Sequence, residues 1–195
     1  AMPFVEIIEA VGTQVQGAKK RSIRVLKEVS VEYEGKRVML SPSEDSVFSG
    51  EIEFNHADIG NQRFETKLVN GNFKHDIAQA RTFGFLHEVE YMRSVGLALG
   101  GSMDNAIVLG ADKGLNPDGL RFSNEFIRHK LLDAIGDLYL AGGDILGAYD
   151  GVKAGHAINN AILHELFSCD ENWEYVHESA DDKAIIWDAL HADQR

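Results

Sequence analysis

The chain has 195 residues, of which 44% are hydrophobic and 9% aromatic, so it can hold one ample hydrophobic core or two small ones. Its net charge of −12 argues against a nucleic-acid partner, because the summed field of the protein would repel a polyphosphate. The single cysteine excludes an internal disulfide framework, and the lack of a secretory pattern or an apolar stretch of about 20 residues predicts a soluble, cytoplasmic protein without a transmembrane segment.

The first third of the chain is predicted to form a helix followed by strands. Residues 3–12, which begin with proline and end with glycine, carry an apolar run that predicts a short helix. Alternation of apolar and polar residues then predicts three strands in an antiparallel meander, at residues 22–33, 35–43 and 46–54. A further strand is predicted at residues 62–69.

The segment at residues 76–101 contains the run RTFGF at residues 81–85, which mixes poor core residues with two bulky phenylalanines. Such mixing is typical of a ligand-lining turn, and a buried bend fits the same residues equally well. After it we expect a short helix beginning at residues 86–92, a short strand at residues 106–109 and a turn at residues 116–119.

The stretch from Phe126 to Leu140 is the one segment where helical periodicity and site chemistry coincide. Apolar residues recur three or four apart on one face, which predicts a helix packed on a core: Ile127, Leu131, Ile135 and Leu138. His129, Asp133 and Asp137 fall four apart on another face. An imidazole and a carboxylate one turn apart can bind one divalent metal or orient each other. An exposed pair on a solvated helix is the commoner cause of this spacing, so the spacing alone leaves both explanations open.

A strand at Ile145–Tyr149 and a helix from His156 to about Phe167 are predicted next. His156 follows a glycine at the helix start, where the helix dipole disfavours a protonated ring, so a neighbouring carboxylate would be needed to hold its proton. A polar residue near a helix cap explains this position equally well. Trp173–Val176 is a predicted last strand, and four apolar residues of the tail can form a docked C-terminal helix: Ile185, Ile186, Trp187 and Leu190.

Four motifs, taken in order, resemble the UDP-3-O-acyl-N-acetylglucosamine deacetylases, which are zinc-dependent amidases of lipid A synthesis in Gram-negative bacteria: RTFGF, GLALGGSMDNAIV, GLRFSNEFIRHKLLDAIGDL and KAGHAINN. The likeness covers only the second of that family's two domains. With the predicted elements it implies an α+β fold, a two-layer sandwich of a mostly antiparallel sheet on two main helices, with a small insert near the active site. Residues 1–17 resemble the interdomain connection, residues 18–176 the second domain, and residues 177–195 a helical or disordered tail.

The resemblance also implies catalytic roles. His129 and Asp133 match two of three protein zinc ligands, while the third ligand and the general base of the family lie in the first domain. His156 matches a second acid/base residue, Asp137 the carboxylate that orients it, and Thr82 a donor to the developing oxyanion.

Substrate-binding positions are implied in the same way. Lys130 matches a lysine that reaches the diphosphate region, Phe54 an aromatic that stacks on uracil, and Phe83 and Phe85 the lining of the sugar pocket. Leu86, Val89, Met92, Ala98 and Met103 match residues along the acyl-chain passage, and Gly101 and Ser102 complete the substrate-binding set. Filling a core is an equally good explanation for about half of the apolar residues among them.

The expected partners are therefore zinc, the acylated UDP-sugar substrate and the first domain of the same enzyme. With two firm zinc ligands instead of three and no general base, we expect negligible deacetylase activity from this chain alone. A module that binds the nucleotide sugar or the acyl chain without hydrolysis is the alternative. The presence of both His156 and Asp137 favours the enzyme, because binding alone needs no acid/base pair.

Overall fold

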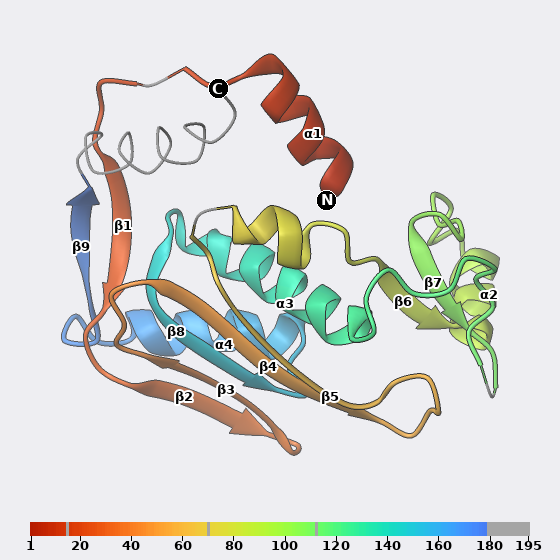
Figure 1. The fold of residues 1–195 in the computed structure, drawn as a ribbon. Helices are drawn as coiled ribbons and strands as arrows, with labels where there is room; N and C mark the ends of the chain where they lie inside the picture. The colour runs from red at the N-terminus through yellow and green to blue at the C-terminus, as the bar shows by residue number, and fades with distance from the viewer. Residues whose placement is uncertain (15, 70, 112, 179–195) are drawn as a thin grey trace.

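A seven-stranded sheet with two helices against one of its faces forms the body of the structure (Figure 1). This structure is a computed structural model, and it describes residues 1–14, 16–69, 71–111 and 113–178. The helices are α1 (Met2–Val11), η1 (Phe73–Ile77), α2 (Leu86–Ser94), α3 (Glu125–Leu138), η2 (Tyr139–Ala141) and α4 (His156–Phe167). The strands are β1 (Lys20–Val25), β2 (Val29–Tyr33), β3 (Lys36–Ser41), β4 (Ser46–Phe54), β5 (Gly60–Lys67), β6 (Thr82–Phe85), β7 (Ala106–Leu109), β8 (Ile145–Val152) and β9 (Trp173–Glu178).

Strand β8 lies at the centre of the sheet. It pairs antiparallel with β3 and parallel with β4, and its first residues also pair parallel with β1. The pairs β2–β3, β4–β5 and β1–β9 are antiparallel, so the predicted mostly antiparallel α+β fold is confirmed. The predicted meander is wrong, because β8 stands between β3 and β4. The predicted strand at residues 22–33 is also wrong, since β1 and β2 are separate strands that pair with different neighbours.

Helices α3 and α4 lie side by side on the same face of the sheet, α3 over β4 and β5 and α4 over β2 and β3. The predicted stripe of α3 is inside the core, with Leu131 2% and Leu138 3% exposed. Gly50 of β4 lets α3 approach closely, because a Cβ atom there would lie 2.9 Å from a methyl group of Leu131 and 3.2 Å from one of Ile127. His129 lies between these two positions, so this contact fixes the height of the histidine above the sheet.

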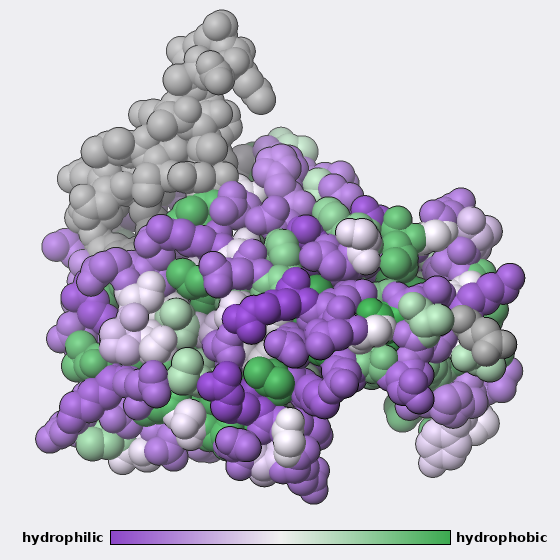
Figure 2. All heavy atoms as spheres, turned by 60° about the horizontal axis from the view of Figure 1, so that its bottom comes forward, coloured by the Kyte–Doolittle hydropathy of each residue, from purple (hydrophilic) through white to green (hydrophobic). Residues whose placement is uncertain are grey.

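The opposite face of the sheet carries a polar cluster. Because side chains alternate along a strand, Ser49 and Glu51 of β4 point away from α3. Asp150 of β8 accepts hydrogen bonds there from Ser49 at 2.7 Å, Arg37 at 3.0 Å and Arg63 at 3.3 Å. The underside of the molecule, seen in Figure 2, is accordingly largely hydrophilic. An ion-paired carboxylate thus lies near the centre of this face.

A small insert, β6–α2–β7, projects from the body beside the start of α3 (Figure 1). The run RTFGF is a strand here and not a turn, because β6 pairs parallel with β7 from Thr82–Ala106 to Phe85–Leu109. A second apolar cluster joins the insert to the body and contains Ile52, Ile59, Ile107, Leu109, Phe126 and Ile127. The insert is therefore fixed against the N-terminal end of α3.

Helix α1 was predicted correctly, and its apolar side chains face outward. Phe4, Ile7, Ile8 and Val11 are 58–82% exposed. The helix is tied to the body at its start, where the backbone of Met2 donates to Ala78, and through an ion pair between Glu9 and Lys74. No helix in the described residues is both long and apolar enough to cross a membrane. The predicted C-terminal helix lies outside the described part of the chain.

Candidate active site

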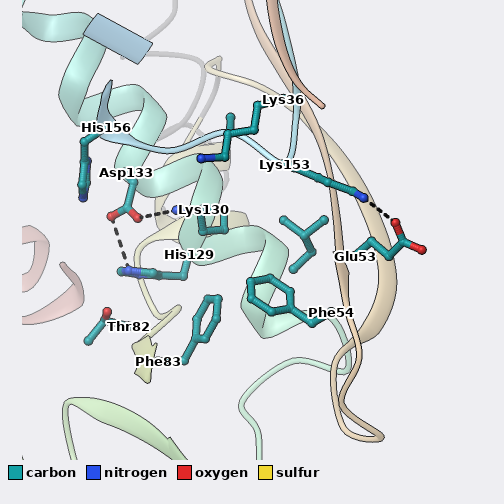
Figure 3. Close-up of a pocket in the computed structure, with 12 residues that line it drawn as sticks. Lys36, Glu53, Phe54, Thr82, Phe83, His129, Lys130, Asp133, Lys153 and His156 are labelled. Carbon is teal, nitrogen blue, oxygen red and sulfur yellow. Dashed lines mark ion pairs between the residues drawn. The ribbon is translucent and has the colours of Figure 1, made fainter. Parts of the chain in front are cut away.

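A cavity of about 460 Å³ opens where α3, β6, the start of α4, the start of β3 and the end of β4 meet (Figure 3). Twelve residues line it: Lys36, Ile52, Glu53, Phe54, Thr82, Phe83, His129, Lys130, Asp133, Lys153, Ala154 and His156. Seven of these were predicted site residues, and they lie on four different elements: Phe54, Thr82, Phe83, His129, Lys130, Asp133 and His156. The fold therefore brings together lining residues that are up to 120 positions apart, from Lys36 to His156.

His129 and Asp133 form a partly buried pair on α3. Their Nε2 and Oδ1 atoms are 3.3 Å apart, and the two side chains are only 13% and 20% exposed. The ammonium group of Lys130 lies 3.6 Å from the other carboxylate oxygen. The pair thus faces the cavity, which removes the explanation of a solvated helix face.

Burial is the main cause that lowers the pKa of His129 below its ordinary value of 6.5. The carboxylate of Asp133 opposes the shift, and the charge of Lys130 reinforces it. The ring is therefore neutral at pH 7. Neutral imidazole and carboxylate are the forms in which these side chains bind metals.

The spacing of this pair fits two ligands of one zinc ion. Zinc bonds of about 2.0–2.2 Å at tetrahedral angles separate two ligand atoms by roughly 3.3–3.5 Å, and the two donors are 3.3 Å apart. Within the described residues, no group of three or more His, Cys, Asp or Glu side chains could hold a metal ion. Since a catalytic zinc has three protein ligands, the pair fits zinc as part of a larger ligand set.

His156 and Asp137 form a second pair at the rim of the cavity. The Nδ1 atom of His156 lies 2.8 Å and 3.0 Å from the two carboxylate oxygens of Asp137. The His156 side chain is 73% exposed, whereas Asp137 is 21% exposed. Asp137 of α3 is therefore the carboxylate that His156 was expected to need at the start of α4. Because it binds Nδ1, the Nε2 atom of the ring stays available to the cavity.

A buried ion pair holds β6 against α3. Glu125 is 0% and Arg81 is 6% exposed, and the guanidinium donates to both carboxylate oxygens at 2.9 Å and 3.1 Å. The backbone amides of Arg81 and Arg121 donate to the same carboxylate at 3.0 Å and 2.6 Å. Because Arg81 precedes Thr82 and Glu125 lies one turn before His129, this pair sets the position of Thr82 relative to the histidine. Sequence reasoning missed the pair, because Arg81 and Glu125 lie in two different motifs and nothing in either motif indicates that they contact each other.

The predicted acyl-chain residues surround a second cavity of about 350 Å³ in the insert. Seven predicted substrate-binding residues contribute to its lining: Leu86, Val89, Met92, Ala98, Gly101, Ser102 and Met103. Thr82 and Phe83 line this cavity and the first one, so the two adjoin at β6. The structure therefore joins a polar cavity to an apolar one.

The aromatic residues divide into two groups. Phe54 and Phe83 both line the first cavity, with ring centroids 5.7 Å apart. Phe85 lines neither cavity and packs against Phe54, with centroids 6.5 Å apart, and against the ring of His87 at 5.9 Å. Phe85 therefore supports the cavity wall from behind.

Two lysines that the sequence did not single out also line the first cavity. Lys36 opens β3, and Lys153 follows β8 and forms an ion pair with Glu53 at 2.5 Å. With Lys130 they place three ammonium groups around one cavity in a chain of net charge −12. The position of Lys153 inside the motif KAGHAINN was the only local sign of its place near the site.

Comparison with known proteins gives one consistent family. The sequence profile of UDP-3-O-acyl N-acetylglycosamine deacetylase matches residues 1–168. Curated relatives named UDP-3-O-acyl-N-acetylglucosamine deacetylase include one from Aliarcobacter butzleri, 44% identical over 97% of this chain and 64% of its own length. One from Chromobacterium violaceum is 47% identical over 90% of this chain and 58% of its own length, and one from Stenotrophomonas maltophilia is 49% identical over 90% and 59%. The chain thus spans about three-fifths of the length of these relatives.

Proposed function

Since the chain belongs to the UDP-3-O-acyl N-acetylglycosamine deacetylase family, we propose that it carries part of the active site of a zinc-dependent deacetylase. The reaction is hydrolysis of the acetamide of UDP-3-O-acyl-N-acetylglucosamine, which releases acetate during lipid A biosynthesis. One observation carries this proposal: the pairs His129–Asp133 and His156–Asp137 meet at one cavity that adjoins an apolar one.

The two cavities suit the two ends of such a substrate. The lysines of the first cavity supply positive charge for a diphosphate, and Phe54 offers an aromatic face for a base. The second cavity exposes mainly apolar side chains, as a fatty acyl chain requires. A substrate that occupies both cavities would have its sugar, and with it the acetamide, at their junction at Thr82 and Phe83, beside His129.

His129 and Asp133 would hold the zinc ion, because they are the neutral imidazole and the carboxylate whose spacing fits it. The chemistry that a bound zinc ion supplies is polarisation of the amide carbonyl and a more acidic water. Lys130, 3.6 Å from Asp133, would orient that carboxylate.

The remaining groups handle protons and charge. The hydroxyl of Thr82 donates a hydrogen bond to the carbonyl oxygen as negative charge develops on it. His156, with Nδ1–H held by Asp137, presents Nε2 to the cavity and delivers a proton there to the departing amine. Asp137 stabilises the positive charge of the ring before that transfer.

We further propose that another domain of the same enzyme completes the site. The two metal donors of the described residues are fewer than a catalytic zinc uses. The nearby carboxylates are already in ion pairs: Asp133 with His129, Asp137 with His156 and Glu53 with Lys153. A third ligand and a general base from another domain would supply both functions. Residues 1–17 would then connect the two domains and residues 18–176 form the second one.

Deacetylation by this chain is expected only after the site is completed. The chain alone should release acetate from UDP-3-O-acyl-N-acetylglucosamine at least roughly 100-fold to 10,000-fold more slowly than an intact relative. This factor is the usual rate contribution of a general base. Joining it to the part of the Chromobacterium violaceum relative that it does not match should restore turnover. The measurement is acetate release over time, with the intact relative as reference.

Two outcomes would contradict the proposal in different ways. Turnover by the chain alone within about tenfold of the intact relative is a smaller loss than a missing base allows, so the site would be complete. Substrate binding without turnover in the completed protein would instead identify a binding module.

Zinc binding gives a second test that needs no substrate. Calorimetry should show that the chain alone binds zinc with lower affinity than the completed protein. The loss of a direct ligand should exceed the roughly 10-fold to 100-fold loss of affinity that follows removal of an outer-shell partner. His129→Ala should abolish what remains, whereas His164→Ala, on the exposed side of α4, should leave it unchanged. Tight one-to-one binding by the chain alone would mean that the described residues complete the ligand set without help.

A further inference from the structure

A line of hydrogen bonds runs from the core of the protein to the exposed ring of His156. The hydroxyl of Tyr149 on β8 donates to Oδ1 of Asn159 on α4 at 2.7 Å. The amide nitrogen of Asn159 donates to Oδ2 of Asp137 on α3 at 2.9 Å. Asp137 in turn accepts from Nδ1 of His156 at 2.8 Å. Tyr149 and Asn159 are only 2% and 1% exposed, so the line connects three elements through the interior.

The direction of every bond in this line is determined by its chemistry. An ionised carboxylate only accepts, so Asn159 must turn its NH2 group toward Asp137. Its Oδ1 then needs a donor, and the phenol of Tyr149 is that donor. Burial raises the pKa of Tyr149, and the nearby charges of Asp137 and Asp150 add to the effect, so the hydroxyl stays protonated. No member of the line can reverse without leaving a buried polar atom unpaired.

The phenol is also fixed in place by packing. A Cβ atom at Gly151 would lie 2.5 Å from the hydroxyl of Tyr149, so only glycine at that position leaves room for it. His156, by contrast, is 73% exposed, and within the described residues the hydrogen bonds of its ring run to Asp137. The orientation of the ring therefore depends on the orientation of one carboxylate.

We propose that Asn159, oriented by Tyr149, is a positioning residue for the His156–Asp137 pair. It holds the carboxylate of Asp137 in the plane that keeps the neutral His156 ring in its Nδ1–H tautomer, with Nε2 turned to the cavity. A neutral ring in the wrong tautomer presents an N–H at Nε2, where it needs a lone pair to take up the proton that it later delivers. The catalytic meaning of this arrangement rests on the proposed function, but the arrangement itself is a property of the chain without substrate or metal.

The test is the tautomer of His156 in the isolated chain, read from the nitrogen chemical shifts of the labelled ring. The measurement is made with a chelator present and at a pH well above the range in which histidine titrates. The signals of His156 are those lost in His156→Gln. The wild-type ring should be mainly Nδ1–H, and Asp137→Asn defines the ratio without the carboxylate.

Asn159→Ala should lower the ratio of Nδ1–H to Nε2–H by about fivefold or more, which is the factor that one typical hydrogen bond represents. Tyr149→Phe, which removes one oxygen and keeps the ring, should shift the ratio in the same direction by less. Asn160→Ala is the matched control, because the neighbouring asparagine is exposed and should leave the ratio unchanged.

A folded Asn159→Ala protein with the wild-type ratio would overturn the proposal and leave Asn159 a purely structural residue. A wild-type ring that is mainly Nε2–H would overturn it as well. If Asn159→Ala does not fold, the tautomer ratio of His156 in Tyr149→Phe decides the question. An unchanged ratio in that variant would mean that Tyr149 does not orient the Asn159 amide, and it would overturn the proposal. Absence of deacetylation in the completed enzyme would refute the proposed function and leave this measurement unaffected.

Discussion

Replacing Glu125 with alanine is expected to lower the free energy of unfolding by about 3–5 kcal/mol, the usual cost of removing one partner from a buried ion pair. The variant leaves the guanidinium of Arg81 buried without its carboxylate and leaves the amides of Arg81 and Arg121 without an acceptor. Urea unfolding followed by circular dichroism measures the change. Glu90→Ala, at an exposed position of α2, is the matched control and should stay within about 0.5 kcal/mol of wild type.

The pH dependence separates this ion pair from simple packing. Burial alone would raise the pKa of Glu125, but the hydrogen bonds from Arg81 and from the backbone amides of Arg81 and Arg121 outweigh it and lower the pKa below 4.5. The stabilisation is therefore complete above pH 4.5 and is lost as the pH falls through the lower folded value. Glu125→Gln should remove this part of the acid sensitivity. A loss below about 1 kcal/mol for Glu125→Ala would contradict a structural role for the pair.

Replacing His156 with alanine in the completed enzyme is expected to reduce kcat by about 100-fold to 10,000-fold, the usual contribution of a general acid or base. The KM for the substrate should change little, because the ring is 73% exposed at the rim and fills none of the apolar cavity. Steady-state rates of acetate release with purified substrate measure both constants.

His164 offers a matched control on the same helix, since it is an exposed histidine of α4 at two turns from His156. His164→Ala should keep both constants within about twofold of wild type, because exposed substitutions away from a site have small effects. A loss of kcat below about tenfold in His156→Ala would assign the proton transfer to another group. An increase in KM with unchanged kcat would mean that His156 binds the substrate and takes no part in the chemistry.

Local sequence patterns predicted the helices and strands that are determined by neighbouring residues. Residues 3–12, 106–109 and 156–167 follow a period or carry clear end signals, and the structure has the expected element at each of them. The buried stripe of α3 was predicted for the same reason, since its period of three to four residues reports one packed face. The break between β1 and β2 was missed, because Leu26–Glu28 contains no glycine or proline to mark it.

The remaining features depend on contacts that are distant in sequence. Nothing near β3 or β4 indicates that β8 pairs between them. Asn159 gave only a weak sign, as a polar residue on the apolar stripe of α4 beside Ile158 and Ile162. For the site, spacing left the pair His129–Asp133 open between two explanations, and only the fold showed that it faces a cavity. The roles came from the resemblance and stay predictions.

The central position of β8 also governs how the chain folds during synthesis. Ser49 of β4 bonds to Asp150 of β8 across 101 positions of sequence. Ribosomes add roughly 5–20 residues per second, so roughly 5–20 s pass between the emergence of the two strands. Until then β3 and β4 each keep an unpaired edge, the feature that most readily joins one nascent chain to another. The strand that joins β3 to β4 is thus made late, before only α4 and β9 among the described elements, and this order exposes the protein to aggregation before it is folded.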